Sequence, residues 1–165
     1  MASQEHVAII KKGAEEWNKW REQNPDVKPD FAWANLVGID LTGANLEAAN
    51  MKLAFCKGTS LKGTRLNGAT LYGTNFEGAD LSDATLEGAT LEGAHLIKAD
   101  LTNASLRGVN LKLANLQGAV LAYSDLTGAA KLNAEQLSTA KTLKGAKIDP
   151  ALLEKLSNTH PELFG

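Results

Sequence analysis

The sequence has one cysteine, four prolines and no long apolar run among its 165 residues. A single cysteine, Cys56, cannot form an intramolecular disulfide and suits a reducing compartment. No apolar run approaches the roughly 20 residues that cross a bilayer. The first residues also lack the basic start and apolar stretch of a signal peptide. These absences predict a cytoplasmic protein with no membrane partner.

An excess of charge of one sign is also lacking. Nineteen acidic residues oppose seventeen basic ones, so the net charge of −2 creates no strong field toward nucleic acid. The three histidines fall in different segments, and no catalytic set, P-loop, dinucleotide-binding glycine motif or metal-ligand spacing accompanies them. We therefore expect no enzyme activity, no cofactor, no metal ion and no direct nucleic-acid partner.

What the sequence does contain is a five-residue repeat. An apolar residue, here called a plug, occupies every fifth position, a period that fits neither a helix nor an alternating strand. Such a period predicts a repeat architecture, in which Cys56 is a small buried hydrophobe. The twenty plugs are Phe31, Leu36, Leu41, Leu46, Met51, Cys56, Leu61, Leu66, Leu71, Phe76, Leu81, Leu86, Leu91, Leu96, Leu101, Leu106, Leu111, Leu116, Leu121 and Leu126.

Small residues and glycines surround the plugs. A small residue, usually alanine, stands two positions before most plugs, and twelve of the twenty positions two after a plug are glycine. Glycine readily adopts the positive φ that the third position of a type II turn requires. Each unit therefore predicts a short extended piece and a tight corner. Corners of one sense would coil the chain into an all-β solenoid whose stacked turns pair like parallel strands.

Several of these units carry a family signature. Residues 44–46, 79–81, 99–101 and 114–116 read alanine, asparagine or aspartate, leucine. With the period of five, they resemble the A-[DN]-L-x-x signature of the pentapeptide-repeat family over about 100 of the 165 residues. The resemblance implies a right-handed quadrilateral β-helix with four units per coil, hence about five coils. It is closer to cyanobacterial-type members with a Trp-containing N-terminal segment than to quinolone-resistance members.

The pattern divides the chain into three segments: an N-terminal helical cap at 1–28, the repeat at 29–130 and a C-terminal helical cap at 131–165. Apolar residues with helical spacing predict one amphipathic helix from near Ser3 to the stop at Asn24. Solenoids need such caps to cover their terminal hydrophobic layers.

The C-terminal cap carries two helix-start signals. Asn133 and Gln136 form a capping-box pattern. Asp149 and Pro150 supply the N-cap and first residue of a further helix. Between them, residues 145–148 look like one stray repeat unit.

If four units make a coil, residues twenty apart lie above one another, and charge is banded along the axis. The basic band is Lys52, Lys57, Lys62 and Arg65. The acidic band is Glu77, Asp80, Asp83, Glu87 and Glu92. One interpretation is pairing between coils, as at Lys57/Glu77 and Glu87/Arg107, each exposed pair contributing about 0.2–1 kcal/mol. The other is that these bands are partner-binding patches, the acidic one for a basic partner.

An apolar spot interrupts the polar surface near the N-terminal end. Trp33, Leu53 and Phe55 come together there on the twenty-residue map. We expect the N-terminal helix to cover them; the alternative is an exposed patch that binds a partner.

The leading functional hypothesis is a non-catalytic protein–protein interaction or scaffold module, a monomer or weak dimer with an unidentified protein partner. Rigid, preformed walls lower the ordering cost of binding. The alternative, implied by the resemblance, is a DNA-mimicking inhibitor or protector of DNA gyrase. Ten acids against seven bases leave the repeat at only −3, and a basic band imitates DNA poorly.

Overall fold

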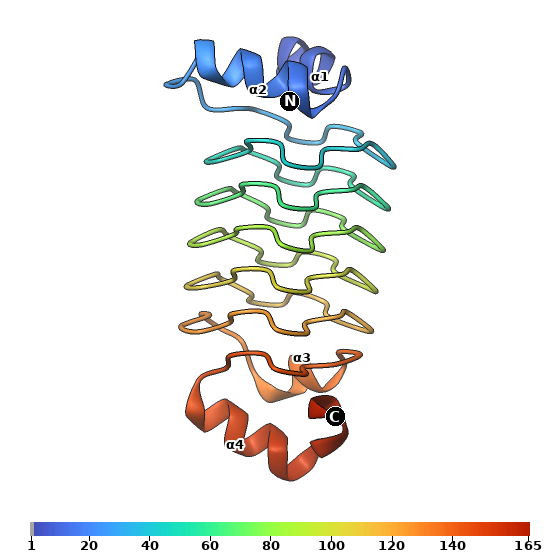
Figure 1. The fold of residues 1–165 in the computed structure, drawn as a ribbon, viewed down its shortest axis with the longest axis vertical. Coiled ribbons are helices and arrows are strands. Elements are labelled where there is room, and N and C mark those ends of the chain that lie inside the picture. The colour runs from blue at the N-terminus through green and yellow to red at the C-terminus, as the bar shows by residue number, and fades with distance from the viewer. Residues whose placement is uncertain (1) are drawn as a thin grey trace.

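The computed structural model describes residues 2–165 as an elongated stack of coils with helices at both ends (Figure 1). Helices α1 (Gln4–Ile10) and α2 (Ala14–Gln23) lie at one end of the stack. Helices α3 (Ala134–Ser138) and α4 (Pro150–Thr159) and the 3-10 helix η1 (Pro161–Phe164) lie at the other. None of these helices has the length and apolar character needed to cross a membrane.

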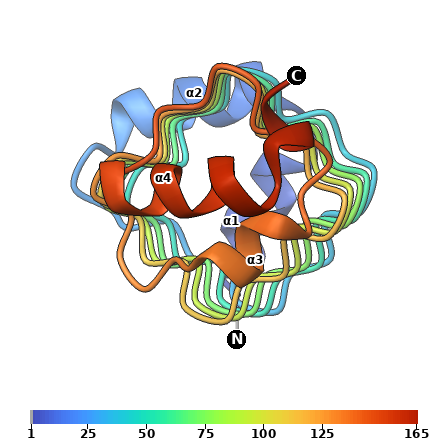
Figure 2. The same cartoon turned by 90° about the horizontal axis from the view of Figure 1, so that it is seen from below.

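Parallel bridges join residues that are twenty apart. Asp30 bridges Asn50, Asn50 bridges Thr70, and the same step recurs through the repeat. The predicted vertical register is therefore confirmed, and the coils superimpose when viewed along the axis (Figure 2). Within residues 2–165 every bridge is isolated and no continuous strand forms. The repeat is thus a solenoid in which successive coils are joined by single bridges.

The plugs form the core of the stack. All twenty are at most 1% exposed, and they belong to one contiguous cluster with the small residues. Threonines replace some of the alanines at no loss of hydrogen bonding. Thr59 Oγ1 donates to the Leu36 carbonyl and Thr74 Oγ1 to the Met51 carbonyl, both at 2.7 Å. These bonds offset the cost of burying a hydroxyl.

The corners require positive φ, which Gly88 adopts at 66°. Some larger residues adopt it too, and glycine in the next coil makes room for them. The ring of Tyr123, at φ 59°, lies over Gly145, where an added Cβ would be 2.5 Å from it. Leu53 lies over Gly73 in the same way, at 2.6 Å. Corner glycines therefore serve both the turn and the packing between coils.

Where the residue before a plug is asparagine or aspartate, its side chain holds the corner that follows. Asp80 Oδ1 accepts a hydrogen bond from the backbone N–H of Ser82 at 2.9 Å. The same bond links Asn115 to Gln117 at 3.0 Å. Because asparagine and aspartate both make this bond, their alternation in the repeat has a structural cause.

The prediction of one continuous N-terminal helix was wrong. The chain forms two helices, because Gly13 turns sharply at φ 113° and becomes the N-cap of α2. Trp17 of α2 is fully buried, with its ring centroid 5.1 Å from that of Phe31. Its indole Nε1 donates to the Asn45 carbonyl at 2.8 Å. The helices therefore seal the end of the first coil.

At the C-terminal end the predicted capping box forms, with Asn133 Oδ1 accepting from the Gln136 N–H at 2.8 Å. The predicted start of α4 is confirmed, with Asp149 as the N-cap residue and Pro150 as the first helical residue. The Asp149 carboxylate accepts from the N–H of Gly128 in the last full coil at 3.1 Å.

The stray unit at 145–148 belongs to a partial sixth coil. Thr142 bridges Val120 and Lys147 bridges Asp125, each at a spacing of twenty-two. The segment that contains α3 thus adds two residues before the chain rejoins the stack. Leu143 of this partial coil is fully buried.

Candidate interaction surface

The bridging residues define four walls, which we name after their residues in the first coil: the Asp30, Asn35, Asp40 and Asn45 walls. Two-residue corners join neighbouring walls. The Asn35 wall stacks Asn35, Phe55, Asn75, His95 and Asn115, all exposed or partly exposed.

The predicted charge bands contact each other across coils. Lys57 Nζ lies 2.9 Å from Glu77 Oε1, and Lys62 Nζ lies 3.8 Å from Asp83 Oδ2. All four side chains remain well exposed, so each pair contributes about 0.2–1 kcal/mol or less.

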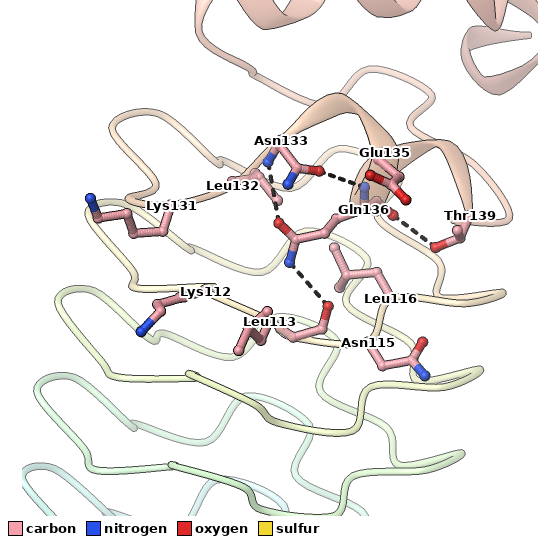
Figure 3. A pocket seen from close by; sticks show the side chains of 11 residues that line it. Lys112, Leu113, Asn115, Leu116, Lys131, Leu132, Asn133, Glu135, Gln136 and Thr139 are labelled. Carbon is pink, nitrogen blue, oxygen red and sulfur yellow. Dashed lines mark hydrogen bonds between the residues drawn. The ribbon is translucent and has the colours of Figure 1, made fainter.

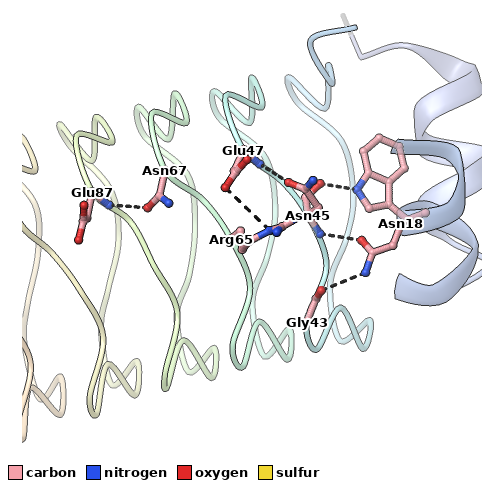
Figure 4. A network of polar contacts seen from close by, with 8 residues as sticks. Asn18, Gly43, Asn45, Glu47, Arg65, Asn67 and Glu87 are labelled. Carbon is pink, nitrogen blue, oxygen red and sulfur yellow. Dashed lines mark hydrogen bonds and ion pairs between the residues drawn. The ribbon is translucent and has the colours of Figure 1, made fainter. Parts of the chain in front are cut away.

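Arg65 contacts the coil below it, with Nε 3.8 Å from Glu47 Oε1 (Figure 4). The predicted pairing of Glu87 with Arg107 was wrong: within residues 2–165 no ion pair joins them. The Glu87 carboxylate instead accepts from Ser105 Oγ at 2.9 Å. Its backbone N–H donates to Asn67 Oδ1, also at 2.9 Å (Figure 4).

The remaining charged candidates also have partners within the chain. Lys52 Nζ lies 5.3 Å above the centre of the Tyr72 ring, a cation–π distance. Glu92 Oε1 lies 2.9 Å from Lys112 Nζ. The hydrogen bond from Lys112 lowers the pKa of Glu92, and its partner raises the pKa of Lys112. These contacts support pairing between coils; a partner-binding role for the bands stays a prediction.

The apolar spot is not covered by the N-terminal helices, contrary to expectation. Trp33 is 57% exposed and Phe55 47% exposed. The reason is that α2 packs inward on Phe31 and toward Asn45, away from this wall. Leu53 alone is largely covered, by its own packing over Gly73.

These side chains belong to a larger apolar surface that follows the Asn35 wall and its two corners. Within the repeat, five of the six exposed large hydrophobic side chains lie there, and only Tyr123 lies elsewhere. The five are Trp33, Val37, Phe55, Tyr72 and Leu113. Val37 and Tyr72 were missed from the sequence, where single apolar residues at corner positions have no distinctive pattern.

A groove of about 880 Å³ lies where this wall ends against α3 (Figure 3). Leu113, which is 75% exposed, and Lys131 are among the residues that line it. Gln136 crosses it and donates through Nε2 to the Leu111 and Ala114 carbonyls, at 2.8 and 3.1 Å. Its amide takes the place of a backbone donor that a sixth coil would supply.

The chemically reactive side chains are held in structural roles. Burial raises the pKa of Cys56 to about 12, which suppresses its thiolate. His6 Nδ1 accepts from the Asp30 N–H at 3.0 Å, so this ring supports the first coil. Across residues 2–165 no three His, Cys, Asp or Glu side chains gather as a metal site would require.

Comparison with known families now identifies the repeat. The model of the Pentapeptide repeats family matches residues 30–55, 59–96 and 94–129, in eight copies. The chain belongs to the pentapeptide-repeat family. The match spans the walls and corners described above.

Solved pentapeptide-repeat structures resemble parts of the chain. A thylakoid-lumen protein of Arabidopsis thaliana is 34% identical over 53% of this chain and 65% of its own, with a TM-score of 0.46. Rfr23 of the cyanobacterium Cyanothece 51142 is 38% identical over 58% of this chain and 62% of its own, with a TM-score of 0.40. This chain thus spans less than two thirds of either.

A third structure is full-length QnrB1, a plasmid-mediated fluoroquinolone resistance protein. It is 18% identical over 79% of this chain and 72% of its own, with a TM-score of 0.38. No curated protein sequence matches the chain.

Proposed function

We propose that this protein is a non-catalytic interaction module that presents the apolar surface of the Asn35 wall to a protein partner. The observation that carries the proposal is the gathering of five exposed apolar side chains along one wall and its two corners. Apolar side chains scattered singly over a surface need no explanation, whereas a gathered set marks an interaction site. Trp33, Phe55 and Tyr72 are also the aromatic types that dominate binding energy at interfaces.

The architecture suits this role. We infer that the coils form a right-handed quadrilateral β-helix with segments 1–28 and 131–165 as caps, in keeping with the twenty-residue bridges and the outline in Figure 2. A backbone bonded at every coil is ordered before binding, so a partner meets a preformed surface. Charged residues at the corners, such as Lys57 and Glu77, would form the polar rim of the interface. The unit that binds is a monomer or weak dimer.

The DNA-mimic alternative has weaker support. Imitating duplex DNA needs rows of unpaired carboxylates. Here Glu77, Asp83 and Glu92 each lie within 4 Å of a lysine. We therefore do not assign to this chain the fluoroquinolone resistance that the name of QnrB1 states. A DNA supercoiling assay separates the two ideas, because inhibition or protection of gyrase at micromolar concentration would favour the mimic.

The proposal is tested by a variant that returns the apolar surface to the pattern of neighbouring coils. Trp33→Gly copies Gly73, Phe55→Asn copies Asn75, and Tyr72→Thr removes the third aromatic ring. The control, Ser82→Ala with Thr102→Ala, changes a corner on the other side of the stack. From a lysate of the source organism, we expect a protein retained by the wild type and the control to be lost from the triple variant. Equal retention by all three would reject the surface.

A further inference from the structure

The N-terminal helices cover only part of the edge of the first coil. Along the Asp30 wall, Ser3 N–H donates to the Asp30 carbonyl and Ala2 N–H to the Ala32 carbonyl, both at 3.0 Å. Along the Asn45 wall, Asn18 pairs with Asn45 and with the Gly43 carbonyl, and Figure 4 shows this contact. No such contact reaches the edge between the residues Asn35 and Thr42 from any of residues 2–165.

Six backbone groups on that edge have no hydrogen-bond partner among residues 2–165, and the residues that carry them are exposed. They are the N–H groups of Asn35 and Asp40 and the carbonyl groups of Asn35, Val37, Asp40 and Thr42. An unpaired edge of this kind is a template for another chain.

The next coil shows what these groups are shaped to bind. Phe55 N–H donates to the Ala34 carbonyl at 2.9 Å, and the Phe55 carbonyl accepts from Leu36 N–H at 2.8 Å. Ser60, one unit further on, makes the equivalent pair of bonds. In the second coil the equivalents of all six groups are therefore hydrogen-bonded to the first coil. The first coil presents the same groups on its outer edge, where no further coil pairs with them.

We propose that this open edge, from Asn35 to Thr42, binds a segment of a partner protein that is extended along the Asn35 wall and along the Asp40 wall and turns at the corner between them, as strand addition to both walls. The proposal rests on the interaction role given above and assigns it a mode, strand addition, in which backbone bonds provide affinity and side chains provide specificity. The chain offers its own precedent, because the backbone N–H groups of Ala2 and of the extended residue Ser3 already occupy the adjacent part of this edge.

The surroundings define the chemistry of the segment. Trp33 and Val37, 57% and 51% exposed, flank the edge and favour apolar side chains on the outer face of the segment. Asp40 is the one ionisable side chain in residues 33–43, so a lysine or arginine beside it gives charge complementarity. Leu36 and Leu41 are already fully buried and offer the segment no apolar surface.

A second copy of the chain fits less well than such a segment. Its own edge carries the same acidic Asp40, and α1 and α2 lie at the same end of the molecule (Figure 1). Two identical edges would therefore offer neither the basic residue nor a free extended strand.

The test uses the full chain and a library of random decapeptides displayed on phage. Selected peptides, made synthetically, are added to isotopically labelled protein, and amide hydrogen exchange is followed by NMR. We expect saturating peptide to slow exchange at Asn35 and Asp40 at least tenfold. The Asn75 and Asp80 amides, already bonded to Ala54 and Thr59, are the internal control and should not change.

A pair of variants isolates the backbone. Asn35→Pro removes the N–H donor and should weaken peptide binding at least tenfold, whereas Asn35→Ala keeps the N–H and should change it less than threefold. If Asn35→Pro does not fold, the exchange data on the wild type decide.

The proposal is overturned if selection gives no peptide that binds below about 100 μM, or if bound peptides leave Asn35 and Asp40 exchange unchanged. Protection of both amides in a self-associated protein without peptide would assign the edge to a second copy and also overturn it. A partner lost from the apolar-surface variant but without effect on these amides would keep the proposed function and remove the edge.

Discussion

The indole Nε1 of Trp17 donates a hydrogen bond to the backbone carbonyl oxygen of Asn45, 2.8 Å away and twenty-eight residues later in the chain. The ring is fully buried and packs on Phe31, the first plug. One side chain therefore closes the hydrophobic end of the stack and completes a carbonyl that has no coil beneath it. The N-terminal cap is fastened at the Asn45 wall, which is why the Asn35 wall stays open.

Removing this hydrogen bond by substituting Trp17 should destabilise the protein more than the small loss of side-chain volume suggests. Trp17→Phe leaves the Asn45 carbonyl unsatisfied, and we expect a loss of about 1–3 kcal/mol in the free energy of unfolding, measured in urea. Trp17→Ala should cost about 3–5 kcal/mol through the added cavity. Trp20→Phe is the control, because Trp20 is only partly buried, and it should cost less than either. Equal losses for Trp17→Phe and Trp20→Phe would contradict the role of the bond.

The corner glycines should separate into two classes. Gly88→Ala meets open space, so only its φ of 66° is unfavourable, and we expect a loss of about 1–2 kcal/mol. Gly145→Ala should lose more, because the Tyr123 ring occupies the position of its Cβ. In a Tyr123→Ala background the extra loss should disappear. A Gly145→Ala cost that does not depend on residue 123 would show that the ring is not packed there.

The Glu92–Lys112 pair predicts a specific pH response. Its hydrogen bond lowers the pKa of Glu92 below 4.5 in the folded state. The stabilisation is therefore present above the unfolded pKa and is lost as the pH falls through the folded one. Carbon-detected NMR titration should place the Glu92 midpoint below those of free glutamates, and Lys112→Ala should raise it. A midpoint unaffected by Lys112→Ala would mean that the ion pair is absent in solution.

Cys56 should be inert in the folded protein. Burial raises its pKa to about 12, so almost no thiolate exists at neutral pH, and the sulfur is out of reach of reagents. A disulfide reagent should react with it only after urea unfolds the chain. Rapid reaction in native buffer would contradict the buried position.

The plugs and their register could be predicted from the sequence because each is a local choice repeated twenty times. A leucine such as Leu81 has the same kinds of neighbour as the plugs at the equivalent position of the other coils, so one pattern determines its environment. The capping box at Asn133 was predictable for a similar reason, since its partner Gln136 lies three residues away.

Contacts between residues that are far apart in the sequence could not be predicted from the repeat pattern. The break at Gly13 depends on how α2 must turn to place Trp17 on the first coil. The Asp149 carboxylate accepts a hydrogen bond from the distant Gly128 N–H and makes none to the first turn of α4. Glu87 likewise bonds Ser105 rather than Arg107. The openness of the Asn35 wall follows from the first of these, the placement of α2 by Trp17.

Every wall assignment depends on the stacking of residues twenty apart, and a distance measurement tests it directly. Spin labels at Asn35→Cys and Asn115→Cys lie on one wall four coils apart, and the buried Cys56 stays unlabelled. At about 4.8 Å per coil, double electron–electron resonance should give a narrow distribution near ~19 Å between their backbones, widened by the label arms. A broad distribution, or one centred beyond ~35 Å, would contradict the register and with it the Asn35 wall as an interaction surface.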